Sequence, residues 1–335
     1  MSRFLERIIE RAKTDKKTIV LAEGNDVRTI KAAAMAIEQN VADIIILGEK
    51  ASILKMAEEE KVDISAATLI NPVEDVNFED FVNKFYEMRK AKGMTPEKAE
   101  ETLKNTLYYG CMMVKNGVAD GMVAGACNSS SNVLRPALQI LKTAPGTKLV
   151  SAFFIMCVPD CEYGADGVFL FADSGLNENP DADAVSEIAI SSAKSFKTLV
   201  EEEPVIAMTS YSTYGSAKSE LVDKMQLATK LAKEKRPDLL LDGELQADAA
   251  IVPSVGASKA PGSPVAGKAN VLIFPDLNVG NTAYKLVQRL AKAEAYGPVT
   301  QGIARPVNDL SRGCSAEDIV GVIGITCVQA QNNAE

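Results

Sequence analysis

The chain has 335 residues, with 45 acidic and 36 basic side chains, six cysteines and no histidine or tryptophan. Without histidine there can be no Ser-His-Asp group and no histidine zinc site, so any general acid or base must be Asp, Glu, Lys, Tyr or Cys. A formal net charge of −9 disfavours a surface that binds nucleic acid or anionic membrane.

Short apolar runs alternate with helical patterns along the chain. Apolar residues between Phe4 and Ala12 recur at helical spacing and predict an amphipathic first helix. Expected strands cover 18–24, 42–48, 120–126, 149–158, 167–173, 204–212, 239–246, 269–277 and 298–302. Expected helices cover about 26–39, 51–60, 96–114, 132–144, 181–200, 218–235, 280–294 and a last one from near Ser315. Such alternation predicts an α/β fold with mostly parallel sheets.

The length indicates two domains, because single cores usually stop growing near 250 residues. Pro145 and Gly146 punctuate the likeliest boundary, and a second break falls before Pro298. We therefore expect residues 1–144 with 298–335 to form one domain, and 145–297 to form another that carries the dimer contact. Ligands of α/β proteins bind outside the carboxyl ends of strands, which draws attention to the loops after 120–126, 204–212 and 298–302.

The compartment is predicted from apolar runs and cysteines. The longest apolar stretch, 149–158, is far shorter than the roughly 20 residues of a membrane span, and the first 17 residues contain no signal-peptide core. None of the cysteines forms a C-x₂-C pair, so reduced, mostly buried thiols and no metal site are expected. We expect a cytoplasmic protein.

A phosphate-loop motif is only partly matched. Residues 262–268 fit G-x₄-G-K, but Ala269 stands where a hydroxyl would hold Mg²⁺, and the segment runs into a strand instead of a helix. No G-x-G-x-x-G opens a helix after a strand. The sequence thus disfavours both nucleotide-binding motifs.

Residues 308–318, NDLSRGCSAED, are the segment richest in reactive groups. Ser315-x-x-Asp318 before an apolar run is typical of a capping box, which is a purely structural interpretation. Alternatively, Ser311, Arg312 and Asp318 place a hydroxyl, a guanidinium and a carboxylate at one helix N-terminus, which is a natural anion site.

Cations at three other places have similar alternatives. Arg89 could be a solvated helix end or a ligand group. Arg135 follows three serines at residues 129–131, and Lys218 follows a run of hydroxyls and glycine at residues 212–217. Each arrangement can cap a helix or hold a phosphate. Two such strand-to-hydroxyl-to-cation junctions suggest an anionic substrate with more than one charged end.

These segments resemble the phosphate acetyltransferases (phosphotransacetylases) of the phosphate acetyl/butyryltransferase family. The matching blocks are 134–139 (LRPALQ), 214–219 (YGSAKS), 297–302 (GPVTQG) and 306–314 (PVNDLSRGC), in family order. The resemblance covers essentially the whole chain. It implies two α/β/α domains with a cleft between them, an isocitrate-dehydrogenase-like architecture and a homodimer. The implied reaction is acetyl-CoA plus phosphate in exchange with CoA plus acetyl phosphate, with no tightly bound cofactor. The expected partners besides a second copy of the chain are these small-molecule substrates, with no nucleic acid and no membrane.

The resemblance also assigns site residues by motif. Asp318 matches a base toward the CoA thiol, Ser311 a hydrogen-bond partner of the thiol or of the developing charge, and Arg312 the arginine facing the transferred phosphate. Arg89 and Arg135 match arginines that bind substrate, through the CoA phosphates. The other substrate-binding candidates are Ser129, Ser130, Cys161 (which is not a nucleophile), Ser216, Lys218 and Asn308.

One position departs from the family. Many members carry histidine where this chain has Asn128. Asparagine can hydrogen-bond but cannot titrate, so the departure puts an essential histidine in the shared mechanism in doubt.

The expected chemistry sets a requirement on the base. A thiol of pKa near 8.5 and an aspartate near 3.9 differ by roughly 4.6 units, which makes full proton transfer about 6 kcal/mol uphill. The carboxyl must therefore be raised by burial, or the proton must move as the C–S bond forms. Because Cys314 resembles a structural position, we expect direct transfer within a ternary complex.

Three alternatives remain open. Phosphate butyryltransferase shares the chemistry but needs a larger acyl pocket. A metal-dependent dehydrogenase on a related scaffold would need an acidic metal cluster and a cofactor loop that the sequence does not show. A CoA- or phosphate-binding module would bind without turnover.

Overall fold

The computed structural model describes residues 2–332 and divides into two compact units, which are described separately. The first unit contains Leu5–Pro145 and the segment from Ile303 onward, and the second contains the residues up to Phe4 and Gly146–Gly302. The expected fold class, α/β with mostly parallel sheets, is confirmed. No helix within residues 2–332 has the length and hydropathy that spanning a bilayer requires.

The first unit has a five-stranded sheet in the order β11-β4-β1-β2-β3, and every pairing is parallel. Its strands are β1 (Thr18–Leu21), β2 (Asp43–Leu47), β3 (Thr68–Ile70), β4 (Gly121–Ala124) and β11 (Val307–Asp309). Its helices are α1 (Arg3–Thr14, from Leu5), α2 (Val27–Glu38), α3 (Lys50–Glu60), η1 (Pro72–Glu74), α4 (Phe78–Arg89), η2 (Lys90–Lys92), α5 (Pro96–Leu103), α6 (Thr106–Lys115), α7 (Ser130–Ile140) and α13 (Ala316–Asn332).

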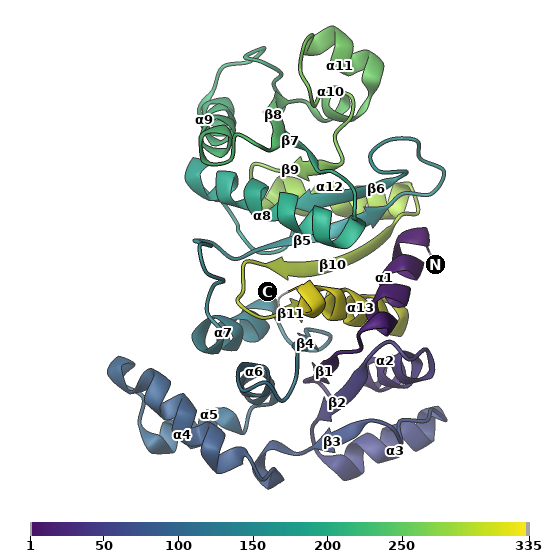
Figure 1. The fold of residues 1–335 in the computed structure, drawn as a ribbon, viewed down its shortest axis with the longest axis vertical. Coiled ribbons are helices and arrows are strands. Elements are labelled where there is room, and N and C mark those ends of the chain that lie inside the picture. The colour runs from purple at the N-terminus through teal and green to yellow at the C-terminus, as the bar shows by residue number, and fades with distance from the viewer. Residues whose placement is uncertain (1, 333–335) are drawn as a thin grey trace. The chain divides into compact units, whose positions relative to one another are not determined.

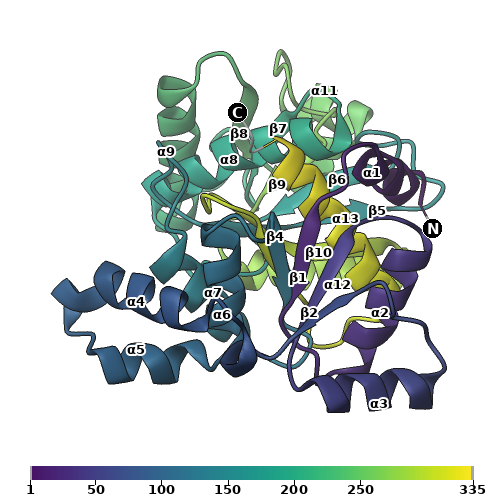
Figure 2. The ribbon, with the colours of Figure 1, turned by 60° about the horizontal axis from the view of Figure 1, so that its bottom comes forward.

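The C-terminal segment completes this sheet. β11 pairs with β4, and α13 packs against α2, β1 and β4, so the yellow helix lies beside the purple N-terminal strands in both Figure 1 and Figure 2. Every residue of α13 from Ile319 to Val328 is buried. A helix that is apolar on all sides is a core element, which explains its position against the sheet.

The second unit has a six-stranded sheet in the order β10-β5-β6-β9-β7-β8. Its strands are β5 (Ser151–Cys157), β6 (Val168–Ala172), β7 (Val205–Thr209), β8 (Leu240–Leu245), β9 (Val271–Ile273) and β10 (Glu294–Gln301), and its helices are α8 (Ala182–Val200), α9 (Glu220–Lys235), α10 (Ala247–Ile251), α11 (Pro253–Lys259) and α12 (Leu277–Leu290). β10, β5 and β6 are antiparallel and the other pairings are parallel. The expected boundary at 297/298 falls inside β10, whose pairing with β5 continues to Gln301.

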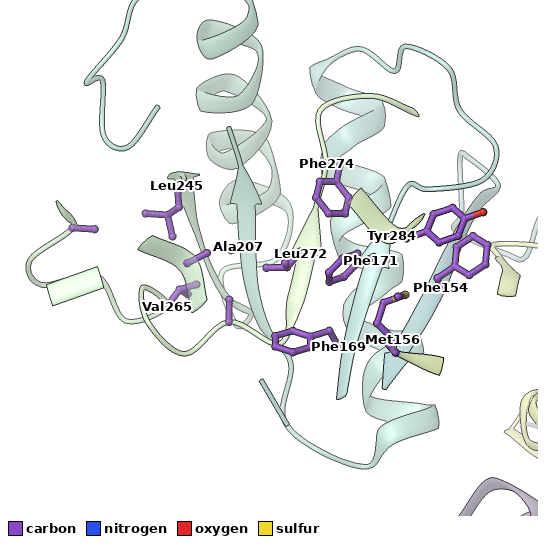
Figure 3. Packing of buried hydrophobic residues seen from close by; sticks show 14 residues of the cluster. Phe154, Met156, Phe169, Phe171, Ala207, Leu245, Val265, Leu272, Phe274 and Tyr284 are labelled. Carbon is purple, nitrogen blue, oxygen red and sulfur yellow. The ribbon is translucent and has the colours of Figure 1, made fainter. Parts of the chain in front are cut away.

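Aromatic residues dominate the core of the second unit (Figure 3). Phe154 stacks on Tyr284 with ring centroids 3.9 Å apart, and Phe171 meets Phe274 edge-on at 5.3 Å. Each buried ring stabilises the folded state by about 1.5–3 kcal/mol through burial alone. This packing stabilises the sheet from whose strand ends the loops of the second unit extend.

One expected helix is wrong in its extent. The segment 96–114 forms two helices, α5 and α6, and not one. The side-chain oxygen of Asn105 accepts hydrogen bonds from the N–H groups of Leu107 at 2.9 Å and Tyr108 at 3.4 Å. Asn105 therefore caps a new helix, which is a favoured position for asparagine.

Candidate active site

Three loops of the first unit meet at the carboxyl edge of its sheet. Because β11, β4 and β1 are adjacent and parallel, the loops that follow them begin side by side. These loops carry Glu23, residues 125–131 and residues 310–315. This edge is where open α/β sheets place ligands.

Glu23 holds the loop after β4. Its carboxylate accepts the N–H groups of Gly125 at 2.8 Å, Ala126 at 2.7 Å, Cys127 at 3.2 Å and Asn128 at 3.0 Å. Glu23 is buried. The carboxylate thus fixes the backbone that leads into the serines of α7.

Asn128 also donates its side-chain amide to Glu23, at 2.8 Å. This position, where many relatives have histidine, therefore helps to hold the loop by a hydrogen bond that needs no titrating group. Asn128 is only partly buried, so it lies between the buried carboxylate and the surface.

Arg28 ties the three loops together and was missed from the sequence. It pairs with Asp26 through two bonds of 3.0 and 2.7 Å. It also donates to the carbonyl oxygens of Ala126 at 2.7 Å, Arg312 at 2.8 Å and Cys314 at 3.1 Å. Hydrogen bonds from Arg28 lower the pKa of Asp26, and Asp26 raises the pKa of Arg28. The guanidinium fork suits such multiple contacts.

The segment around Ser311 and Arg312 is exposed and turned by a backbone bond from Cys314 N to Ser311 O at 2.9 Å. Ser315 and Asp318 form the reciprocal capping box: Ser315 N–H donates to Asp318 Oδ2 at 2.9 Å, and Asp318 N–H donates to Ser315 Oγ at 3.1 Å. The structural interpretation of this pair is therefore confirmed, and Asp318 lies in the first turn of α13.

The serines before Arg135 begin α7. Ser129 caps the helix by accepting the N–H of Asn132 at 3.4 Å, and its hydroxyl lies 3.0 Å from that of Ser131. Ser130 is the first helical residue and is half-buried. Arg135 lies one to two turns further along the same helix, on an exposed position.

Arg89 and Arg135 both influence the pKa of Tyr108 through their positive charges. Burial raises the pKa of Tyr108, and the positive charges of Arg135 and Arg89 oppose that rise. Within the described residues, the buried Nε of Arg89 has no hydrogen-bond partner. Two guanidinium groups gathered around one side chain form a local positive field in a chain of net charge −9.

Asn308 differs from the other predicted site residues because it faces the core. It is fully buried, and its amide donates to Thr326 at 2.9 Å and to Gln329 at 2.7 Å, both on α13. These contacts suit a packing role, so its predicted role in substrate binding gains no support.

The neighbouring Asp309 ends β11 and is also buried. Burial, with a smaller effect from the Glu23 carboxylate, raises the pKa of Asp309 to about 6. In the sequence analysis Asp309 stood out only through its place in the 308–318 segment.

The remaining predicted residues belong to the second unit. Glu244, buried at the end of β8, accepts the Ser212 hydroxyl at 2.8 Å and the Gly215 N–H at 2.7 Å. This fixes the loop in which the Ser216 hydroxyl accepts the Thr213 N–H at 3.1 Å and Lys218 is exposed. Cys161 is partly buried and packs against the aromatic core.

The comparisons with known proteins agree with each other. The family described as "Phosphate acetyl/butaryl transferase" matches residues 3–327. The chain is 65% identical to the phosphate acetyltransferase of Acetivibrio thermocellus and 52% identical to that of Clostridium acetobutylicum, each over 98% of both chains. A phosphotransacetylase structure from Streptococcus pyogenes is 43% identical with a TM-score of 0.92, covering 99% of this chain and 100% of that one. This chain belongs to the phosphate acetyl/butyryltransferase family.

Proposed function

We propose that the protein is a phosphate acetyltransferase that catalyses the reversible exchange of acetyl-CoA and phosphate with CoA and acetyl phosphate. The observation that carries this proposal is the 65% identity, over 98% of both chains, to a relative named phosphate acetyltransferase. CoA and acetyl phosphate are then substrates, and no tightly bound cofactor is needed.

The reaction places three demands on the site. The thiol must lose a proton, the acyl carbon must be attacked, and the leaving phosphate must be neutralised. We assign the phosphate to Arg312, whose backbone is anchored by Arg28. A planar guanidinium matches two phosphate oxygens at once, and positive charge aimed at the leaving group lowers the barrier most.

We assign the CoA phosphates to Arg89 and Arg135, because their guanidinium groups share the surroundings of Tyr108. A polyanionic ligand approaching a chain of net charge −9 needs such a local cluster. Ser129, at the N-terminus of α7, adds a polar group to the same helix. Ser216 and Lys218 in the second unit stay predictions for the other charged end of the substrates.

We assign proton transfer to Asp318 and stabilisation of the thiol or of the transition-state charge to Ser311. The capping box occupies Asp318 Oδ2. Its other oxygen, Oδ1, is the atom we assign to the thiol proton. Attack is direct within a ternary complex: the C–S bond forms as the bond from the acyl carbon to phosphate oxygen breaks. The proton lost by the thiol is balanced by the one that the departing phosphate carries as HPO₄²⁻.

The deciding measurement is release of free thiol from acetyl-CoA when phosphate is added. Phosphate-dependent release without NAD(P) supports the acetyltransferase, whereas binding without release would make the protein a CoA- or phosphate-binding module. Rates with acetyl-, propionyl- and butyryl-CoA distinguish it from a butyryltransferase, which would favour the longer chain. A radiolabelled acetyl group retained on enzyme denatured in the absence of CoA would contradict direct transfer.

The assembly and the compartment are further parts of the proposal. We propose a cytoplasmic homodimer, in line with the family resemblance. Light scattering on the purified full chain should give about twice the 35.8 kDa of one chain. A monomer mass over the range of working concentrations would contradict it.

A further inference from the structure

The loop between β7 and α9 carries Lys218, one of the expected substrate-binding residues (Figure 1). Lys218 is exposed, and within residues 2–332 its ammonium group makes no ion pair and no hydrogen bond. In a chain of net charge −9, such a cation can bind an anion without first leaving a carboxylate partner. How tightly it binds depends on how firmly its loop is held, because ordering a mobile loop on binding costs free energy.

The backbone of this loop is fully hydrogen-bonded within its own unit. Every N–H group from residue 213 to residue 217 has a partner. The partners are the carbonyl and carboxylate of Glu244, the carbonyl of Thr213 and the hydroxyls of Ser212 and Ser216, at distances between 2.7 and 3.2 Å. Because loop N–H groups bind anions only when they are unoccupied, anion binding here is left to the side chains.

Tyr214 lies at the turn of this loop. Its φ of +48° is in the left-handed region, which residues with a side chain rarely adopt. Such a conformation persists only where the surrounding structure holds it, and it is common at functional sites. The Tyr214 hydroxyl donates to Asp242 Oδ2 at 2.5 Å, although 47% of the residue is exposed. This bond fixes the turn from which the chain continues to Lys218.

Asp242 is the anchor of the turn. It is buried on β8, a strand at the edge of the sheet. Besides Tyr214, it accepts hydrogen bonds from the Lys233 ammonium on α9 at 2.7 Å and from the Ser263 hydroxyl at 2.5 Å. The Ser263 hydroxyl in turn accepts two N–H groups of its own 262–268 segment, at 3.3 and 3.1 Å. The partial phosphate-loop motif thus supports Asp242, and a carboxylate with all these partners is a rigid anchor.

We propose that Tyr214 and Asp242 are positioning residues, which hold the 212–218 loop so that the Lys218 ammonium binds a phosphate group of a substrate. This inference rests on the proposed acetyltransferase function. An ammonium recognises a phosphate as a point charge, so the phosphate groups of CoA and that of acetyl phosphate offer it the same chemistry. Without the tether from Tyr214 to Asp242, the loop would have to be ordered when the substrate binds, and affinity would fall.

The test is a double-mutant cycle on the KM values for CoA and for acetyl phosphate. Tyr214→Phe keeps the exposed ring and should raise one KM roughly tenfold, the size of a lost hydrogen bond to a charged group, with kcat within about twofold of wild type. Lys218→Gln should raise the same KM at least as much. Because Tyr214 acts through Lys218, the double variant should match Lys218→Gln alone. Tyr296→Phe is the matched control: it removes a phenol bond to Glu294 in the same unit and should leave both KM values unchanged.

The outcomes separate the tether from a general effect on the fold. The larger rise, in the KM for CoA or in that for acetyl phosphate, identifies the substrate that carries the phosphate. Unchanged KM values in Tyr214→Phe or in Lys218→Gln, effects that add in the double variant, or an equal rise in Tyr296→Phe would each overturn the positioning role. If Tyr214→Phe does not fold, Asp242→Asn replaces it in the cycle. A wild-type protein without phosphate-dependent thiol release would overturn the proposed function itself.

Discussion

Replacing Asp309 by asparagine should stabilise the folded protein at neutral pH. Burial raises the pKa of this carboxyl from 3.8 to about 6, so the folded state resists its ionisation. At about 1.4 kcal/mol per pH unit, the ionised group destabilises the folded state by about 3 kcal/mol at pH 8. Asparagine has the same shape and no charge, and it removes this penalty. The free energy of unfolding should therefore rise by up to about 3 kcal/mol.

The sign of the pH dependence follows from the same shift. Between pH 3.8 and about 6 the folded state binds the proton more tightly than the unfolded state, so this group contributes stability at low pH that is lost as the pH rises through 6. The advantage of Asp309→Asn should be full at pH 8, about half as large at pH 5 and absent below pH 4.

Thermal unfolding followed by circular dichroism can measure this difference. The melting temperature of Asp309→Asn should exceed that of wild type by roughly 5–10 °C at pH 8, with a smaller gap at pH 5. Asp120→Asn, which loses charge at a residue that is already hydrogen-bonded, should not be stabilised. A gap that is absent at pH 8, or that does not change with pH, would refute an ionised and unpartnered Asp309.

Four other substitutions test the site and its support. Asp318→Asn should lower kcat by ~10²- to 10⁴-fold in initial-rate assays, the usual range for a general base, and a loss below tenfold would contradict that role. Arg135→Ala should raise the KM for CoA about tenfold or more while kcat changes little; an equal fall in kcat would point to a role beyond binding. Arg28→Lys should lower the free energy of unfolding by about 1–3 kcal/mol in urea, because an ammonium cannot span the same carbonyls. Glu23→Gln should show a similar loss in urea, since an amide donor then faces backbone N–H groups, and an unchanged midpoint would count against its anchoring role.

Most strands and most helices were predictable because they depend on local patterns. The runs 18–24 and 42–48 are apolar and β-branched, and they form β1 and β2 within a few residues. β11 was missed because it is short and two of its three residues, Asn308 and Asp309, are polar, so it shows neither an apolar run nor a periodicity. The break at Asn105 was missed because the residues around it continue a helical pattern of apolar positions. The new helix begins there because the Asn105 side chain accepts a backbone N–H group, an interaction that apolar spacing does not reveal.

The supporting residues of the site could not be predicted, because their roles depend on distant partners. Glu23 meets Asn128 across 105 positions, and Arg28 meets Arg312 across 284. In the sequence, Glu23 and Arg28 look like ordinary surface residues. Their partners come within hydrogen-bond distance only through the order of the strands in the sheet. The motif residues Ser311, Arg312 and Asp318 could be predicted as site candidates because they lie close together in the sequence.

The two carboxylates at this sheet edge show how stability and function can be separated. The Glu23 carboxylate accepts five hydrogen bonds from the loop after β4, so its burial is explained by a structural role. Asp309 has none among the described residues and lowers stability by about 3 kcal/mol when ionised, a large part of the 5–15 kcal/mol typical of a folded domain. Asparagine would fill the same space without that loss. A variant that is both more stable and less active would show that the carboxyl contributes to activity, whereas one that is more stable and equally active would leave the charge without a function.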